Sequence, residues 1–241
     1  MIYLFDGSES GFLTAFVRGF NDKNALLVSN KKTVQLPLGM PTIVVDTDVK
    51  ISEKARARLT LFDCHACKDL ELLLRSGEPD SEQAAFLYLR FLAQRKTPVR
   101  NVLTEPCVFD AFERIKRIRL EIHRFHGFIR FMECESGALY APFAPDHDIC
   151  ELLLPHFRAR FSNFPFVLHD VVRNKAAVYD GKNAFLAPLD KAEVLLAADE
   201  EEWQGLFKKY YHAVNIPSRE RLKQMRGYLP ARYEKFMPER H

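Results

Sequence analysis

The sequence lacks the features that identify several large classes of protein. No run of about 18 apolar residues occurs, so we expect neither a transmembrane helix nor a membrane partner. Residues 1–6 lack the basic start and long apolar region of a signal peptide, so we expect a cytoplasmic location. The motifs G-x-x-x-x-G-K-[ST], G-x-G-x-x-G and G-x-S-x-G are absent, as is a three-cysteine radical-cluster motif. We therefore do not expect an NTPase, a dinucleotide-dependent enzyme or an α/β-hydrolase.

Cysteine is also scarce, and its pattern predicts neither disulfides nor a metal site. The chain has five cysteines, an odd number that cannot pair completely, and their spacing is irregular. Cys64 and Cys67 form a single C-x-x-C with no second ligand pair for zinc and no βαβ context for redox chemistry, so we interpret them as core residues. The run Asp146-His147-Asp148 could hold a divalent ion, but three such close ligands rarely suffice, and Asp148 suits a helix cap. We predict no metal and no cofactor.

The charge is small in total but uneven along the chain. The formal net charge is +3. Residues 114–130 hold six Lys or Arg and one acid, residues 205–241 hold nine Lys or Arg and three acids, and residues 190–202 hold six acids and one Lys. A basic patch is typical of a phosphate-binding surface, although solvated helix faces would explain these charges equally well.

The N-terminal half reads as mainly helical with short strands. We expect a strand from Ile2 to Phe5, a helix capped by Ser8 that runs through Phe20, and a strand at 42–45. Ser52 is expected to cap a helical region that continues, with a break at 77–81, to about Ala93. A polar connector follows at residues 96–106.

The C-terminal half alternates between the two kinds of element. A helix from Val108 to about Phe125 has one apolar stripe, and Gly127 ends it. We also expect strands at 128–133, 138–143, 166–170, 175–179 and 184–186. Helices are expected at 149–161, 199–214 and 218–227, with a short segment near Tyr233. We predict an α+β fold whose antiparallel sheet has flanking helices, preceded by a largely helical part, with domains at 1–106 and 107–241.

Residues 121–180 carry the candidate site. They contain five of the eight histidines, interleaved with basic and aromatic residues, a composition that suits an anionic, planar ligand such as nucleic acid. On a strand, His169, Val171 and Arg173 share one face and Asp170 takes the other. His169 and Arg173 could therefore line one groove and stabilise a phosphate or an oxyanion. The alternative is a structural histidine beside a salt-bridging Asp170.

Four further residues are candidate contacts to phosphate. Arg130 is expected on a strand with aromatic neighbours, where it could stack on bases, and Arg124 precedes it on the helix. His156 and Arg160 lie four positions apart, so one helical face could bring both to a phosphate. The alternatives are exposed helix faces, and for Glu121 a simple pair with Arg117.

These motifs resemble a bacterial family described as "probable DNA metabolism protein". The resemblance covers nearly the whole chain, and its motifs are Phe5-Asp6-Gly7-Ser8, Gly11-Phe12-Leu13, Glu121-x-His123-Arg124-Phe125-x-Gly127-Phe128-x-Arg130-Phe131, Pro145-Asp146-His147, His156-Phe157-x-x-Arg160, His169-Asp170-x-x-Arg173, Tyr179-Asp180 and Leu229-Pro230-x-Arg232-Tyr233. The chain departs from the family at Arg221, where Arg-x-Asn is expected. The resemblance implies a pathway and a radical SAM DNA repair or modification protein as partner, since family members are encoded beside one. A related domain is fused to uracil-DNA glycosylase-like proteins.

Three hypotheses about function follow, because the sequence does not define a reaction. The first is a DNA-binding accessory protein in DNA repair or modification, with phosphate contacts at Arg124, Arg130, His156, Arg160 and Arg173. The second is an enzyme acting on DNA or a nucleotide, with His169 as general acid or base, Asp170 as the other candidate catalytic residue, and Arg124, Arg130 and Arg173 holding phosphate. The third is an interaction scaffold whose acidic segment, 190–202, binds a basic partner.

Overall fold

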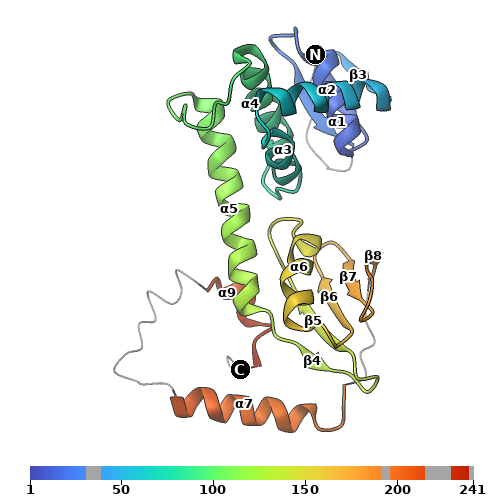
Figure 1. The fold of residues 1–241 in the computed structure, drawn as a ribbon, viewed down its shortest axis with the longest axis vertical. Coiled ribbons are helices and arrows are strands. Elements are labelled where there is room, and N and C mark those ends of the chain that lie inside the picture. The colour runs from blue at the N-terminus through green and yellow to red at the C-terminus, as the bar shows by residue number, and fades with distance from the viewer. Residues whose placement is uncertain (31–38, 191–195, 215–228, 239–241) are drawn as a thin grey trace. The chain divides into compact units, whose positions relative to one another are not determined.

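The computed structural model describes residues 1–30, 39–190, 196–214 and 229–238 (Figure 1). The chain divides into two compact units, an N-terminal unit of Met1–Ile118 and a C-terminal unit of Arg119–His241. The division lies inside helix α5 (Pro106–Phe128), whereas we placed the domain boundary at the beginning of that helix. The predicted helix at 218–227 lies outside the described residues, and so does Arg221.

The N-terminal unit combines a small sheet with helices. Its elements are β1 (Ile2–Phe5), α1 (Glu9–Gly19), β2 (Leu26–Ser29), β3 (Thr42–Val44), α2 (Val49–Phe62), α3 (Ala66–Leu74) and α4 (Ser81–Arg95). The strands pair in parallel in the order β2-β1-β3. Parallel pairing follows from the connections, because α1 carries the chain from one end of β1 back to the start of β2. The sequence predicted β1 and β3 but missed β2.

The predicted helix caps of this unit are right in one case and wrong in another. The Ser8 hydroxyl accepts a hydrogen bond from the Gly11 amide at 2.9 Å, which confirms the cap of α1. Asp48, not Ser52, caps α2 by accepting from the amides of residues 50 and 51. The helix therefore begins one turn earlier than predicted. Cys64 is exposed, so our interpretation of it as a core residue is wrong.

A buried ionic cluster holds the helices of this unit together. Asp69 is fully buried on α3 and accepts a hydrogen bond from Arg100 and another, at 3.2 Å, from the Tyr88 hydroxyl on α4. Arg100 also pairs with Asp63 at 3.2 Å. Burial next to the Asp69 carboxylate raises the pKa of Tyr88, because ionisation would place a second negative charge in the same site.

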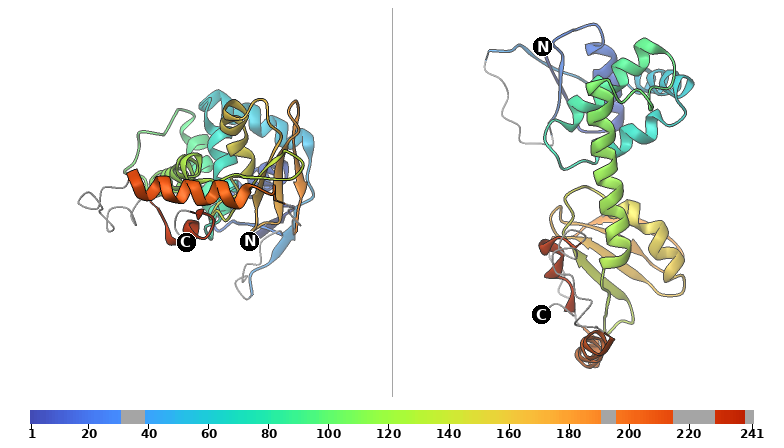
Figure 2. Two further views of the ribbon diagram at one scale, coloured as in Figure 1. Left: turned by 90° about the horizontal axis from the view of Figure 1, so that it is seen from below. Right: turned by 90° about the vertical axis from the view of Figure 1, so that its left-hand side faces the viewer.

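The C-terminal unit is built on a five-stranded sheet. Beyond the last turns of α5, its elements are β4 (Met132–Glu133), β5 (Leu139–Phe143), α6 (Cys150–Arg160), β6 (Phe166–Asp170), β7 (Lys175–Tyr179), β8 (Ala184–Pro188), α7 (Glu200–Val214) and α9 (Ala231–Glu234). The strand order follows the chain, from β4 to β8. Figures 1 and 2 show α6 packed on one face of this sheet, where Cys150, Leu153 and Phe157 are buried.

The predicted α+β fold is confirmed, but the sheet is mixed and not purely antiparallel. β5 and β6 pair in parallel, while the other neighbouring strands are antiparallel. The reason is the crossover through α6, which returns the chain to the end of the sheet at which β5 began, so that β6 runs in the same direction as β5. The helix cap predicted at Asp148 is also wrong, because its carboxylate accepts from Lys175 at 2.9 and 3.1 Å and Ile149 occupies the cap position.

In residues 1–30, 39–190, 196–214 and 229–238, no helix is both long enough and apolar enough to cross a bilayer.

Candidate functional site

Glu121 is the centre of a buried polar network in the C-terminal unit. Its side chain is 4% exposed, although it lies on the polar-looking part of α5. One carboxylate oxygen accepts from the Asp146 amide at 2.8 Å and from the Tyr233 hydroxyl at 2.8 Å, and the other accepts from the His147 amide at 2.9 Å. This carboxylate therefore joins α5, the loop that contains Asp146 and His147, and α9.

Arg232 completes the network from α9. Its guanidinium lies 3.5 Å from the Glu121 carboxylate and donates to the Asp146 carboxylate. Burial beside Glu121 raises the pKa of Tyr233. The alternative pairing of Glu121 with Arg117 is wrong, since Arg117 donates to Glu78 at 2.8 Å.

Arg173 holds the same loop from its other side. Its guanidinium donates to the Pro145 carbonyl at 3.1 Å, the Asp146 carbonyl at 2.6 Å and the Asp170 carboxylate at 3.0 Å. Asp170 is fully buried, and this burial raises its pKa although Arg173 acts in the opposite direction. β6 ends at Asp170, so the chain turns before Arg173. The predicted shared face of His169 and Arg173 is therefore wrong, and Arg173 instead pairs with Asp170.

His169 is buried with both ring nitrogens engaged. Nδ1 lies 2.6 Å from the Tyr140 hydroxyl, and Nε2 lies 2.9 Å from the Leu189 carbonyl. Only 3% of the residue is exposed. These contacts fix the ring between β5 and the segment after β8, and they leave no ring nitrogen for a substrate. The catalytic role predicted for His169 and Asp170 stays a prediction without geometric support.

Arg130 lies in the connection after α5 and not on a strand, so that part of our prediction is wrong. Its guanidinium donates to the Gly127 carbonyl at 2.8 Å and the Ile129 carbonyl at 3.3 Å. Cationic side chains commonly satisfy the last carbonyls of a helix in this way. The same guanidinium lies 5.9 Å from the centre of the Phe207 ring on α7, within the range of a cation–π interaction.

Arg130 also lines a hollow of about 270 Å³ between this connection and α7, which we call the α7 hollow. Its lining residues are Arg130, Phe131, Glu200, Trp203, Gln204, Phe207 and Pro238. Trp203 is 61% exposed and Phe207 is 39% exposed. The Glu200 carboxylate is already engaged by the Glu133 amide at 2.9 Å and by the Gln204 amide at 2.8 Å. The hollow therefore combines an arginine with two accessible aromatic rings.

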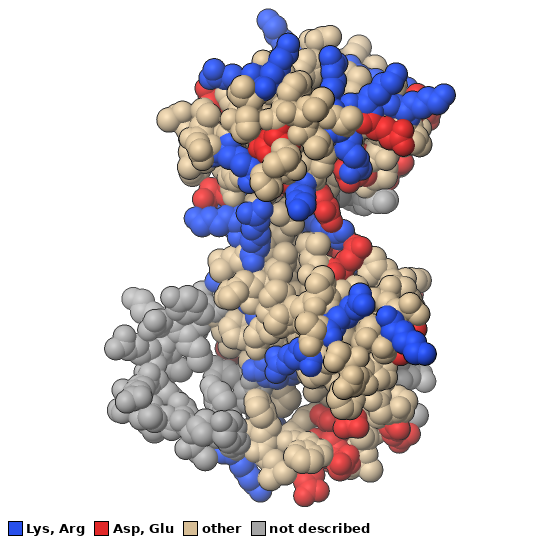
Figure 3. All heavy atoms as spheres, in the orientation of Figure 1, with Lys and Arg blue, Asp and Glu red and all other residues tan. Residues whose placement is uncertain are grey.

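Two more arginines lie on aromatic rings at α6. Arg160 is 5.4 Å from the centre of the Phe161 ring, Arg158 is 5.3 Å from that of Tyr179, and both arginines are exposed. Phe131, which lines the α7 hollow, packs against Phe161 with 4.8 Å between ring centres. On the face drawn in Figure 3, Lys and Arg side chains lie over the α6 side of this unit, and acidic ones gather where α7 begins.

His156 forms a ring stack and does not stand exposed beside Arg160. Its ring lies on that of His126, with 4.0 Å between centres and 13° between planes. Both Nε2 atoms are buried, and neither has a hydrogen-bond partner among the residues that the structure describes. Burial, with smaller effects from His156 and His123, lowers the pKa of His126. Arg124 is partly buried near the end of the same helix, α5.

Sequence reasoning missed Glu121 as the centre of the network and missed Trp203 and Phe207. The signal for the aromatic pair was present, since Trp203 is the only tryptophan and lies four positions before Phe207 in a predicted helix. Glu121 and Tyr233 both lie in motifs of the family resemblance, but no local pattern indicated that these two residues, 112 positions apart, are in contact. Within the described part of the chain, no group of three His, Cys, Asp or Glu side chains could hold a metal ion.

Comparison with known proteins gives a match to a protein family. No curated protein and no solved structure matches the chain. A family model matches residues 79–239, which include the whole C-terminal unit up to its last two residues. The chain therefore belongs to the DUF4130 family, a domain of unknown function.

Proposed function

We propose that this chain is a nucleic-acid-binding accessory protein of DNA repair or modification that holds a single strand along α6 and the α7 hollow. The observation that carries the proposal is the combination of Arg130, Trp203 and Phe207 in one hollow. Proteins that bind single strands combine aromatic rings, on which bases stack, with cations that follow the phosphates. Bases in a duplex are already stacked, so exposed rings favour unpaired nucleotides.

The arginines of α6 supply the phosphate contacts in this proposal. Arg158 and Arg160 are exposed, and neither is paired with a carboxylate in the part of the chain that the structure describes. Phe131 and Phe161 are in ring contact and connect α6 to the α7 hollow through packed aromatic side chains. A backbone that passes the two arginines could thus place a base near Trp203. Arg173 contributes indirectly, because its donors are committed to the loop at 145–146.

The geometry favours this binding role over the two other hypotheses. A general acid or base must exchange a proton with a substrate, and both nitrogens of His169 already contact protein groups. The acidic segment at 190–202 lies partly outside the described residues, and Glu200 within it is committed to the Glu133 amide. A radical SAM protein as partner rests on the family resemblance, and co-purification of the two proteins tests it separately.

Fluorescence anisotropy with a labelled single strand and the matching duplex tests the binding role. We expect tighter binding of the single strand and affinity that falls between about 50 and about 200 mM salt. Trp203→Ala should weaken binding by about 1 to 3 kcal/mol, the usual contribution of one stacked base. Arg158→Ala with Arg160→Ala should reduce the slope of log affinity against log salt by about 1.4, since each phosphate contact on a single strand contributes about 0.7.

Arg18→Ala is the matched control, because Arg18 is an exposed arginine on α1 in the other unit. It should leave both affinity and salt slope unchanged. If Trp203→Ala and the double variant weaken binding no more than Arg18→Ala does, this interface is rejected. Equal affinity for the duplex and the single strand would reject the stacking argument.

A further inference from the structure

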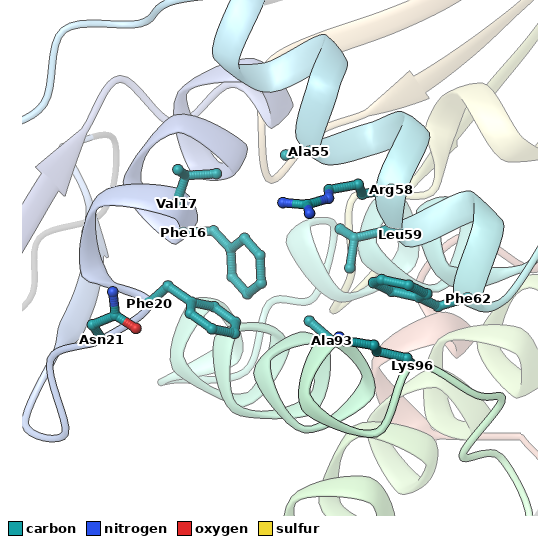
Figure 4. Close-up of a pocket in the computed structure, with 10 residues that line it drawn as sticks. All are labelled: Phe16, Val17, Phe20, Asn21, Ala55, Arg58, Leu59, Phe62, Ala93 and Lys96. Atoms are coloured by element: carbon teal, nitrogen blue, oxygen red, sulfur yellow. The ribbon is translucent and has the colours of Figure 1, made fainter.

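The N-terminal unit contains a second hollow, which we call the α1–α4 slot. It measures about 380 Å³ and opens between α1, α2 and α4. The residues that line it are Phe16, Val17, Phe20, Asn21, Ala55, Arg58, Leu59, Phe62, Ala93 and Lys96 (Figure 4). Its volume falls within the usual range for small-molecule sites, roughly 300 to 1,000 Å³.

The walls of the slot are apolar and its base is small. In Figure 4, Phe16 and Phe20 lie on one side, Leu59 and Phe62 lie on the other, and Ala93 lies between them. Phe16 and Leu59 are almost fully buried, so these parts of the walls belong to the core and are preformed. The rings of Phe16 and Phe20 pack edge to face at 5.6 Å. A slot between aromatic walls with an alanine at its base suits a flat ring.

The polar groups at the slot carry charge of one sign. Arg58 and Lys96 line it together with Asn21, and none of the described residues that line it carries a carboxylate. In the described chain neither Arg58 nor Lys96 forms an ion pair, whereas Arg56 on the same helix pairs with Glu9 at 2.9 Å. Figure 4 shows the Arg58 guanidinium extended toward the space above Phe16. An anion in the slot would give these two cations a partner.

A neighbouring hollow continues the same pattern. It measures about 300 Å³, shares Phe20 and Asn21 with the slot, and is otherwise lined by Lys23, Arg90 and Gln94. None of these described lining residues carries a carboxylate. The acidic end of a ligand in the slot would therefore face positive charge on both sides of Phe20 and Asn21.

Lys96 lines the slot from a strained backbone position. Lys96 ends α4 with φ of +56°, a conformation in which glycine is the usual residue. Its amide donates to the Leu92 carbonyl at 2.8 Å, which a glycine amide would do equally well. The lysine therefore adds a cation to the slot at a position where the fold itself favours glycine.

We propose that the α1–α4 slot binds a small organic anion with a flat aromatic body and a single carboxylate or similar acidic group. The ring lies between Phe20 and Phe62, and the acidic group meets Arg58 and Lys96. A neutral analogue keeps the apolar contacts and loses the ionic ones, and a cationic analogue is repelled. This site lies in the N-terminal unit and is independent of the proposed nucleic-acid interface, which lies in the C-terminal unit.

Titration of the full chain with 8-anilinonaphthalene-1-sulfonate, an aromatic anion that fluoresces strongly in apolar sites, tests the proposal. We expect saturable binding at one site and displacement by 1-naphthoate at lower concentration than by the neutral 1-naphthamide. Ala93→Leu fills the base of the slot with a good helix former, so it should weaken binding at least about tenfold without unfolding the unit.

Two charge variants separate the ionic contacts from the apolar ones. Arg58→Gln and Lys96→Gly should each weaken binding of the anions by roughly two- to fivefold and leave binding of 1-naphthamide unchanged. Lys96→Gly should keep the melting temperature or raise it, so a loss of binding in this variant cannot be attributed to unfolding. Lys50→Gln, an exposed charge on the same helix as Arg58, is the control and should have no effect.

Three results would overturn the proposal. The first is that the wild type shows no saturable binding of the dye. The second is that Ala93→Leu binds the dye with unchanged affinity. The third is that 1-naphthoate and 1-naphthamide displace the dye equally well and that the charge variants do not change the affinity for the anions.

Discussion

Replacing Glu121 should destabilise the C-terminal unit far more than its place on an exposed-looking helix suggests. Glu121→Ala removes the acceptor of two backbone amides and of the Tyr233 hydroxyl, all of them at 2.8 to 2.9 Å. The His147 amide and the Tyr233 hydroxyl are buried, whereas Asp146 is exposed and water can reach it. A buried donor left without a partner costs about 1 to 3 kcal/mol, so the two buried donors give about 2 to 6 kcal/mol. Because a whole domain is stable by about 5 to 15 kcal/mol, this loss removes a large part of the stability of the unit.

Tyr233→Phe provides the graded version of the same test. It removes one hydrogen bond to a charged acceptor and leaves both amides satisfied, so we expect a loss of about 1.5 to 3 kcal/mol. The charge of Arg232 adds little to this estimate, because its side chain is 44% exposed and solvent screens its interaction with Glu121. Glu121→Ala should therefore lower the free energy of unfolding clearly more than Tyr233→Phe does.

Urea unfolding followed by tryptophan fluorescence measures these losses in the correct unit. Trp203 is the only tryptophan in the chain, so its emission reports the C-terminal unit alone. Glu135→Ala, an exposed carboxylate in the turn between β4 and β5, is the control and should change the free energy of unfolding by less than about 0.5 kcal/mol. A Glu121→Ala protein as stable as this control would refute the reasoning.

Three further predictions concern titratable side chains. Burial close to Asp170 raises the pKa of the Cys150 thiol to about 12. Ellman's reagent at pH 8 should therefore label exposed Cys64 rapidly and Cys150 only on unfolding. Equal labelling rates for the two thiols would contradict the burial of Cys150. Because the pKa of Tyr88 is raised, its contribution to stability is complete below the ordinary value of 10.0 and is lost as the pH rises above 10.0. The N-terminal unit should therefore lose stability in alkali. Tyr88→Phe should reduce this loss of stability with pH, as measured by thermal melts followed by circular dichroism. The lowered pKa of His126 has the opposite sign, so its contribution to stability is complete above pH 6.5 and is lost on acidification. His126→Phe keeps an aromatic ring against His156 and removes the titrating imidazole, so it should reduce the acid dependence of stability followed by Trp203 fluorescence, and an unchanged pH profile would contradict the burial of His126.

Local patterns predicted most of the secondary structure. Strands β6, β7 and β8 follow from short runs of apolar residues bounded by turn residues, and α5 follows from its apolar stripe. The parallel pair β5–β6 was also within reach, because a strand, a helix and a second strand of one sheet normally form a parallel crossover.

The candidate site was harder to predict, because its contacts join distant parts of the chain. The alternation rule for strands placed His169 and Arg173 together, but it applies only while the strand lasts, and the chain turns directly after Asp170. Arg130 was misplaced for the related reason that α5 extends to Phe128. Composition predicted a basic, aromatic surface, yet only the structure shows that Arg130 meets Trp203 and Phe207 in one hollow.

The contact between Glu121 and Tyr233 also has a consequence for how the chain folds during synthesis. A ribosome that has just added Glu121 must add 112 more residues before the phenol that binds this carboxylate exists. The N-terminal unit has no such delay, because the residues of its buried cluster are already joined when Arg100 is added. In the nascent C-terminal unit the Glu121 carboxylate can at first be satisfied only by the Asp146 and His147 amides, and the Tyr233 hydroxyl joins this network much later. Chaperones, early release and C-terminal truncation should consequently affect this unit much more than the first.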